Sequence, residues 1–333
     1  ATISCSRSAM RVDRQGRLRV AFLAMFATFP LVRSLCAQAD ESPYTRAVQA
    51  IARRQATDDS VAVPGARSIL LTAGGPTRRA LVLLHGLTDS PRQFEALAYL
   101  LHADGNNVYV PRLPQHGLRG KDASALGALT ATQLEGVADS VVDEARGLGD
   151  SIIVVGLSMG GTVAAWIAQQ FHVARAVLIA PAIEPGRIPS LLDRPLIGLA
   201  DRLPSMTRRS PRESTRPDRE PGFNTRAVAE LLELGRLVAA QADRVSSRTR
   251  SITLLVNASD RTVNESAAEG LARSWLRHGA AVSVYELPDS LRLPHNIIDP
   301  LRGRVAADRV LALLRDLAYG APPSALVRRI PLR

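Results

Sequence analysis

The chain has 333 residues, of which 46% are hydrophobic and 22% are charged, as expected for a globular protein with one large α/β domain and an insertion. Its formal charge is +11, but the basic residues are scattered and Lys121 is the only lysine among them. Aromatic residues make up only 4% of the chain. We therefore expect no nucleic-acid partner, because such partners need clustered basic residues or aromatic stacking platforms.

Residues 1–39 have the three-part pattern of an export signal. A basic stretch, Arg11–Arg19, precedes the apolar run Val20–Val32, and Ala37–Ala39 matches a small-x-small cleavage site. The apolar run is shorter than the roughly 20 residues that span a bilayer. We expect a periplasmic or secreted protein without a stable membrane span after cleavage. An uncleaved membrane anchor and lipidation at Cys36 are the alternatives. Both cysteines lie in this segment, which predicts no disulfide in the mature chain.

The next residues, 40–60, predict a helix over Tyr44–Gln55 and a polar linker over Thr57–Ser60. From Val61 the chain alternates between strands and helices. The expected strands are Ser68–Leu71, Ala80–Leu84, Asn107–Val110, Ser151–Val155, Ala176–Ala180, Ile252–Val256 and Ala281–Leu287. The expected helices are Pro91–His102, Ala131–Leu148, Met159–Phe171, Thr225–Ala242, Glu265–Arg277 and Pro300–Leu317. Several strands are continuously apolar, which predicts a doubly wound, mostly parallel α/β sheet covered on both faces.

One insertion interrupts the alternation. Residues 183–222 are expected to form a small cap, and their stretch Arg208–Pro221 is expected to be a mobile loop. The flanking segments, 61–182 and 223–320, form the predicted core, and residues 321–333 form a peripheral tail. Within the insertion, Ile188–Leu203 carries an apolar stripe. It either packs on the core or forms a wall of a substrate pocket, where Leu192, Leu196 and Leu199 would contact an acyl chain.

The clearest motif is Gly-Leu-Ser-Met-Gly at residues 156–160, between a predicted strand and a predicted helix. In this sharp turn the serine hydroxyl stands above the sheet edge, at the positive N-terminus of the helix. The serine backbone is strained there, and Gly156 and Gly160 avoid clashes between strand and helix. The motif predicts Ser158 as a nucleophile.

A second motif, His-Gly-Leu-Thr-Asp-Ser-Pro at residues 85–91, follows an earlier strand. The loop at this place supplies one backbone N–H of an oxyanion hole, and the residue after the nucleophile supplies the other. We expect Leu87 and Met159 to be these donors, with Gly86 allowing a close approach of the reacting carbonyl. His85 is expected to be structural, because it precedes the nucleophile in the chain.

The general base is expected late in the chain, since the order in such folds is serine, acid, histidine. His295 follows the last predicted strand, in a loop at the carboxyl edge of the sheet. His116 lies in another loop at this edge and is the alternative. His172 is excluded, because its position along the helix that starts after Ser158 places it about 21 Å away.

The acid is expected after the strand Ile252–Val256, where Asp260 is the candidate. Asp260 could instead cap the following helix, in which case Asp289 is the next candidate for the acid. No dinucleotide, phosphate-loop or metalloprotease motif occurs in the sequence, which predicts that the protein needs no cofactor or metal.

Together, the motif at residues 85–91, the turn at 156–160, Asp260 and His295 resemble the carboxylesterase and monoacylglycerol-lipase branch of the α/β-hydrolases. The resemblance covers about residues 66–317. It implies a triad of Ser158, Asp260 and His295, with Leu87 and Met159 as oxyanion donors and a small cap. The expected activity is hydrolysis of small-molecule carboxylic esters, of short or medium acyl length or monoacylglycerol-like, through an acyl-enzyme. Amide, thioester or peptide-like hydrolysis is the alternative, and a non-catalytic binding protein on the same scaffold is a further one.

Overall fold

The computed structural model describes residues 41–120, 124–184, 206–209, 218–220, 222–298, 307–321 and 325–332, which belong to one structural unit. The predicted export signal and the apolar stripe Ile188–Leu203 lie outside the described residues, as does the predicted start of the last helix at Pro300. None of the described helices is long and apolar enough to span a membrane.

The described part of the chain contains a sheet of eight strands, in the order β1-β3-β2-β4-β5-β8-β9-β10. The two edge strands are antiparallel to their neighbours and the inner pairs are parallel. The strands are β1 (Ile69–Leu71), β2 (Ala80–Leu84), β3 (Asn107–Val110), β4 (Ile152–Leu157), β5 (Arg175–Ile179), β8 (Ile252–Asn257), β9 (Val282–Leu287) and β10 (Arg328–Ile330). Every residue of β2, β3, β4 and β8 is buried, as the apolar runs in these segments predict.

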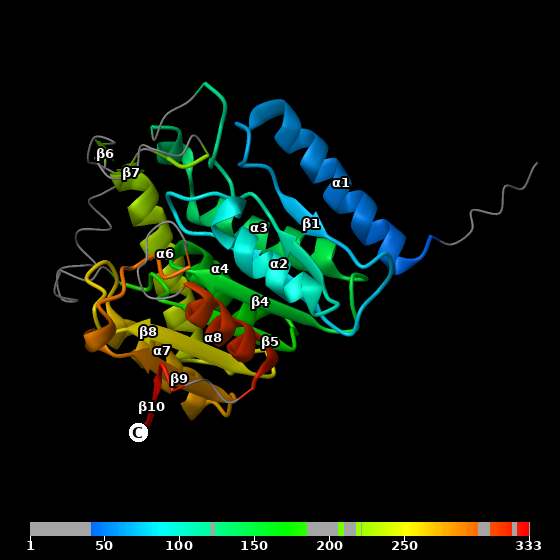
Figure 1. The fold of residues 1–333 in the computed structure, drawn as a ribbon. Helices are drawn as coiled ribbons and strands as arrows, with labels where there is room; N and C mark the ends of the chain where they lie inside the picture. The colour runs from blue at the N-terminus through cyan, green and yellow to red at the C-terminus, as the bar shows by residue number, and fades with distance from the viewer. Residues whose placement is uncertain are drawn as a thin grey trace, which may run out of the picture. The chain divides into compact units, whose positions relative to one another are not determined.

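Helices cover both faces of this sheet (Figure 1). They are α1 (Pro43–Val61), α2 (Glu95–Ala103), α3 (Ala131–Ala145), α4 (Met159–Gln170), α6 (Thr225–Ala242), α7 (Glu265–Arg277) and α8 (Ala307–Tyr319). Two separate apolar clusters result. One packs α1, α3, α4, α6 and α7 on one face, and the other packs α2 and α8 on the opposite face. The predicted doubly wound α/β fold is confirmed.

The strand order reverses direction beside β2, which lies between β3 and β4. Loops that leave the carboxyl ends of strands at such a point diverge and leave a crevice where ligands bind. The parallel register pairs Leu84 with Gly156, so the loops after β2 and β4 start side by side. The register of β8 and β9 pairs Asn257 with Leu287, which does the same for the loops that follow these two strands.

Helix α1 continues past Gln55, so residues 57–60 are helical and the prediction of a linker there is wrong. The physical reason is Asp58, whose carboxylate is buried. It accepts hydrogen bonds from the backbone N–H and the hydroxyl of Ser68, at 2.8 and 2.6 Å, and from Arg112 Nε at 2.8 Å. These partners, distant in the sequence, attach the last turn of the helix to the core.

Two other segments differ from the sequence-based expectation. The tail contributes β10, which pairs with β9 and joins it through an ion pair of 2.6 Å between Arg328 and Glu286, so it is not merely peripheral. In the insertion, β6 (Thr207–Arg209) and β7 (Gly222–Asn224) form a two-stranded antiparallel ribbon. Residues 218–220, near the end of the stretch predicted to be a mobile loop, are buried.

Candidate active site

Ser158 stands at the turn between β4 and α4 in a strained conformation. Its φ is 56° and its ψ is −115°, a region that residues with a side chain rarely adopt. The backbone on either side of the turn is held by hydrogen bonds: the N–H of Ser158 donates to Ile179 O at 2.9 Å, and its carbonyl accepts from Thr162 N at 2.9 Å. The side chain makes no cap to the helix that it precedes, so the hydroxyl stays available to a ligand.

The glycines of this turn are required by packing. A Cβ atom on Gly156 would lie 2.0 Å from the carbonyl oxygen of Gly160, and one on Gly160 would lie 1.9 Å from the carbonyl oxygen of Leu84. Both contacts are with backbone atoms, which cannot move aside as a flexible side chain would. The strand, the turn and the helix therefore pack together only without side chains at these two positions.

His295 and Asp260 meet although 35 residues separate them. His295 Nδ1 lies 2.5 Å from Asp260 Oδ2, and Asp260 Oδ1 accepts the N–H of Thr262 at 2.8 Å. Burial by itself would raise the pKa of Asp260, but the hydrogen bond and charge of His295, together with Thr262, outweigh it and lower that pKa below its ordinary value. Asp260 is thus an ionised acceptor that fixes the orientation of the His295 ring.

Asn257 joins the loops that carry these two residues. Its side-chain amide donates to the carbonyls of Leu293 and Pro294, at 3.0 and 3.2 Å, and its Oδ1 accepts the N–H of Ser259 at 3.2 Å. The sequence analysis did not select Asn257, although an amide at the end of a buried strand is a signal that could have drawn attention to it.

Asp289, the second candidate for the acid, is exposed and hydrogen-bonded to Ser259 rather than to His295. The structure therefore brings Asp260, and not Asp289, to the histidine. His295 Nε2, on the far side of the ring from Asp260, is buried and makes no hydrogen bond with the described residues.

The two predicted oxyanion donors lie beside Ser158, Met159 in the first turn of α4 and Leu87 in the loop after β2. Within the described part of the chain, neither backbone N–H donates to a hydrogen bond. Gly86 has a different role from the glycines of the turn. A Cβ atom there would meet its nearest protein neighbours, on Gln93 and Leu157, at an ordinary 3.8 Å. Packing of the loop against these neighbours therefore does not require glycine at this position, which lines the pocket.

The rings of His85 and His116 contact the backbone of this loop. Leu113 N donates to His85 Nε2 at 3.1 Å, and His85 Nδ1 lies 2.9 Å from Gly86 O. His116 Nε2 lies 2.5 Å from Leu87 O. Both rings are fully buried, and burial lowers both pKa values, that of His116 to about 4. Neutral, buried and bound to the backbone, His116 is not placed to be the general base that the alternative interpretation would make it.

A pocket of about 510 Å³ opens onto these groups. Ser158, His295, Leu87 and Gly86 all line it, and Asp260 lies behind His295. Part of its wall is apolar and comes from the start of α6 and the preceding strand β7, namely Phe223, Val228, Leu231 and Leu232. The other described wall residues include the charged side chains of Asp89, Glu184 and Arg219.

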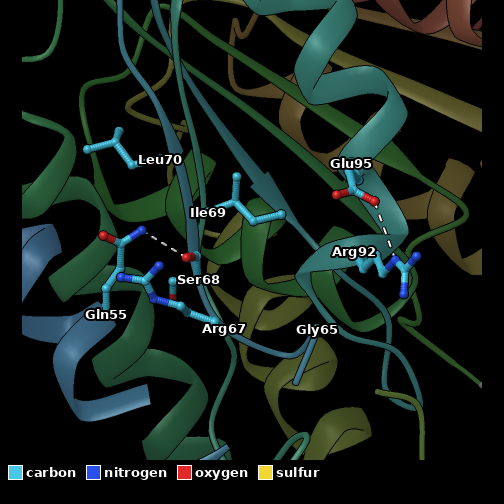
Figure 2. A pocket seen from close by; sticks show the side chains of 8 residues that line it. All are labelled: Gln55, Gly65, Arg67, Ser68, Ile69, Leu70, Arg92 and Glu95. Atoms are coloured by element: carbon cyan, nitrogen blue, oxygen red, sulfur yellow. Dashed lines mark hydrogen bonds and ion pairs between the residues drawn. The ribbon is translucent and has the colours of Figure 1, made fainter. Parts of the chain in front are cut away.

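A second cavity, of about 340 Å³, shares no lining residue with the first (Figure 2). Its polar groups are already paired. Gln55 donates to Ser68 O at 2.9 Å, and Arg92 lies 3.4 Å from Glu95. Figure 2 marks both contacts with dashed lines. Arg67, also on its wall, forms an ion pair of 3.1 Å with Asp59. None of its described lining residues is a histidine or a cysteine, and we assign this cavity no chemistry. Among the described residues, no group of three His, Cys, Asp or Glu side chains is arranged to hold a metal.

Comparison with known proteins agrees with this architecture. The model of the Alpha/beta hydrolase family matches residues 81–326, well over half of the chain, so the chain belongs to this family. No curated protein matches the chain.

Among solved structures, the chain is similar to one reported for LipS and LipT, two metagenome-derived lipolytic enzymes. The TM-score is 0.57, the identity is 22%, and the match covers 77% of this chain and 99% of that one. It is also similar to a monoacylglycerol lipase of Paleococcus ferrophilus, with a TM-score of 0.57, 17% identity and coverages of 76% and 98%. The corresponding values for a monoglyceride lipase of Saccharomyces cerevisiae are 0.59, 14%, 78% and 94%. At these identities the likeness establishes the fold.

Proposed function

We propose that this protein is a serine hydrolase that cleaves carboxylic esters, with Ser158, His295 and Asp260 as its catalytic triad. The observation that carries the proposal is the arrangement at the pocket. A serine on a strained turn at a helix N-terminus opens into the same pocket as a histidine whose other ring nitrogen is bound to a buried carboxylate. This is the arrangement of nucleophile, base and orienting acid that acyl transfer needs.

In the proposed mechanism His295 Nε2 accepts the Ser158 proton as the hydroxyl oxygen attacks the ester carbonyl. The negative charge that develops on the carbonyl oxygen is stabilised by the backbone N–H groups of Leu87 and Met159. His295 then donates its proton to the leaving alcohol, and the acyl-enzyme is hydrolysed by a water molecule that the same histidine activates. The structure contains no hydrogen bond between Ser158 and His295. Such contacts are often long without substrate and tighten in the reacting complex.

The substrates that suit this pocket are esters with a short or medium apolar acyl chain, monoacylglycerols included. An apolar wall formed by Phe223, Val228, Leu231 and Leu232 supports this assignment. Burial of the acyl chain against it would stabilise binding by about 25 cal/mol for each Å² of apolar surface. The similar solved structures include proteins described as lipolytic enzymes and monoacylglycerol lipases, which is in line with the proposal.

The proposal is tested with a fluorophosphonate probe and a panel of p-nitrophenyl esters of increasing chain length. We expect the probe to label the protein once, at Ser158, and Ser158→Ala to abolish both labelling and ester turnover while leaving thermal unfolding unchanged. If the probe labels the protein and amides or thioesters are turned over but esters are not, the protein would be an amide or thioester hydrolase with the same mechanism. A protein that neither reacts with the probe nor turns over any of these substrates would be a binding protein.

We also propose that residues 183–222 form the cap over this pocket and that residues 1–39 form a cleaved export signal. The position of Arg219 in the pocket wall supports the first proposal, and the basic, apolar and Ala-Gln-Ala pattern supports the second. Mass spectrometry of protein recovered from its native host tests the export signal. We expect a mature chain that begins at Asp40, and a retained or diacylated Cys36 would contradict simple cleavage.

A further inference from the structure

Three consecutive residues of the insertion, Asp218, Arg219 and Glu220, are buried against the loop after β2. Ser90 Oγ donates to Asp218 Oδ2 at 2.7 Å. The N–H of Glu220 donates to Thr88 O at 3.2 Å. The side chain of each residue in this stretch is thus less than one-tenth exposed, although the surrounding sequence is dominated by charged residues and prolines. Of the three residues, Arg219 also lines the pocket into which Ser158 opens.

The central contact is an ion pair between Arg219 and Asp89. Arg219 Nη2 lies 2.9 Å from Asp89 Oδ2, and the two side chains are only 5% and 2% exposed. Both residues line the pocket into which Ser158 opens. Removing two charges from water is costly, and their attraction offsets this cost only when the geometry is good. A buried pair at this place is therefore weak evidence for a role in stability alone.

Asp89 connects the ion pair to the catalytic loops on both sides of the pocket. The same Oδ2 atom accepts a hydrogen bond from Gln93 Nε2 at 3.0 Å and another from Asn296 Nδ2 at 3.2 Å. Gln93 in turn uses its Oε1 atom to accept the N–H of Gly86 at 2.9 Å. One carboxylate oxygen thus holds Gly86, the residue before Leu87, through Gln93, and it directly holds Asn296, the residue after His295.

We propose that Arg219 and Asp89 are positioning residues for the triad and the oxyanion hole. In this arrangement, which rests on the proposed esterase function, the guanidinium of the insertion fixes the carboxylate of Asp89. The carboxylate then holds the oxyanion loop and the His295 loop in their reactive geometry. Neither residue transfers a proton. Oxyanion donors act only when they are preorganised, and displacing a catalytic group by about 1 Å can cost roughly a hundredfold in rate.

The decisive variant is Arg219→Met, which keeps the volume of the side chain and removes its charge. We expect kcat for a short p-nitrophenyl ester to fall by about ten- to a hundredfold while KM changes by less than about threefold. Asp89→Asn is expected to give a similar or larger loss, because Asp89 also accepts hydrogen bonds from Gln93 and Asn296. The double variant should lose no more than Asp89→Asn alone, because Arg219 acts through Asp89. Arg219→Lys, which keeps the charge but loses the planar fork, should recover part of the rate.

Arg273→Met is the matched control, because Arg273 forms an ion pair of the same 2.9 Å length with Glu269 on the exposed face of α7. It should leave kcat unchanged. Unchanged kcat in Arg219→Met with a lower melting temperature would overturn the proposal, since the pair would then only stabilise the fold. A rise in KM at unchanged kcat would also overturn it, because Arg219 would then bind the substrate. If Arg219→Met does not fold, Arg219→Lys and Asp89→Asn carry the same test.

A second measurement separates this inference from the proposed function. Amide hydrogen exchange reports on the loops without any substrate. We expect Arg219→Met to increase exchange at residues 86–90 and around His295 and Asn296, and to leave α3 and α7 unchanged. This holds even if the protein hydrolyses no ester. Wild-type exchange rates at these loops in the variant would contradict the positioning role, whereas absent labelling of wild-type Ser158 would contradict the proposed function alone.

Discussion

The turn at Ser158 and the loop after β2 lie side by side at the same edge of the sheet, but they are held in different ways. The turn is fixed by its own backbone: Gly156 and Gly160 allow contacts that no side chain would permit. The loop contains Gly86, which its protein neighbours do not require, and it is fixed by side chains from elsewhere in the chain. The His116 ring contacts the carbonyl of Leu87, and Asp89 forms an ion pair with Arg219 of the insertion.

The comparison shows that two adjacent parts of one site can have different sensitivities. The turn tolerates no added atom but depends on few partners. The loop tolerates small changes in its own residues, but it depends on the protonation state and charge of distant groups. Damage to the turn should therefore appear as lost stability, and damage to the loop as lost rate or as sensitivity to pH.

The largest effect is expected at His295, which lines the same pocket as the turn and the loop. Replacing His295 by Ala should lower kcat by about 10⁴-fold or more without unfolding the protein, because the members of the proposed triad would act as a unit. Steady-state kinetics with a short p-nitrophenyl ester measures the loss. Asp289→Asn is the control, because Asp289 is exposed and hydrogen-bonded to Ser259. Near-normal activity of the His295 variant, combined with loss of activity in His116→Ala, would show that the base is assigned incorrectly.

The comparison of glycines is sharpened by a pair of identical substitutions. Gly160→Ala should destabilise the protein by about 3 kcal/mol, because its Cβ atom would lie 1.9 Å from Leu84 O and the backbone must shift. Gly86→Ala should change the free energy of unfolding by less than about 1 kcal/mol, since its Cβ atom meets protein atoms only at 3.8 Å. Urea unfolding measures both. Equal destabilisation by the two substitutions would remove the distinction between turn and loop.

Acid should act on the loop through its two buried histidines. In the folded protein the pKa of His116 is about 4, against about 6.5 when unfolded, so the unfolded state binds more protons between these values. The free energy of unfolding should therefore fall as the pH drops from 6.5 towards 4, by an amount on the order of 3 kcal/mol for His116. The pKa of His85 is lowered as well, and it adds a loss of the same sign.

Urea unfolding at a series of pH values tests this dependence. His116→Gln, whose side-chain amide can still donate to Leu87 O, should make the free energy of unfolding depend less on pH in this range. His172→Gln, a change at an exposed histidine, should leave the dependence as it is. A His116→Gln variant with the same pH dependence as the wild-type protein would assign the acid sensitivity to other groups.

The smallest effect is expected at the apolar wall of the pocket. Val228 is partly exposed and lines the pocket near the start of α6. Val228→Phe should reduce kcat/KM for medium-chain esters by about tenfold relative to acetate or propionate esters, since a filled pocket rejects longer acyl chains. Val245→Phe is the control, because Val245 is 55% exposed and does not line the pocket. A chain-length profile unchanged by Val228→Phe would place the acyl site elsewhere.

Much of the core was predicted from the sequence to within a residue or two. The strands β2 and β3 and the helices α6 and α7 have the predicted bounds, because apolar runs and helix signals specify such elements locally. The pairing of His295 with Asp260 was expected from the order of elements in this fold, and the structure brings the two side chains together. Elements whose stability comes from distant partners were missed. They include the last turn of α1, which Asp58 attaches to the core, and the edge strand β10.

The sequence by itself determined the turn at Ser158, since a strand, two glycines and a helix in immediate succession leave the backbone one way to pack. Only the tertiary structure decided where Arg219 lies. No local pattern marks this residue, and its stretch of charges and prolines is typical of a solvated loop. Its buried ion-pair partner, Asp89, is 130 positions earlier in the chain. Contacts between such distant residues follow no fixed spacing or periodicity, so no pattern in the sequence predicts them.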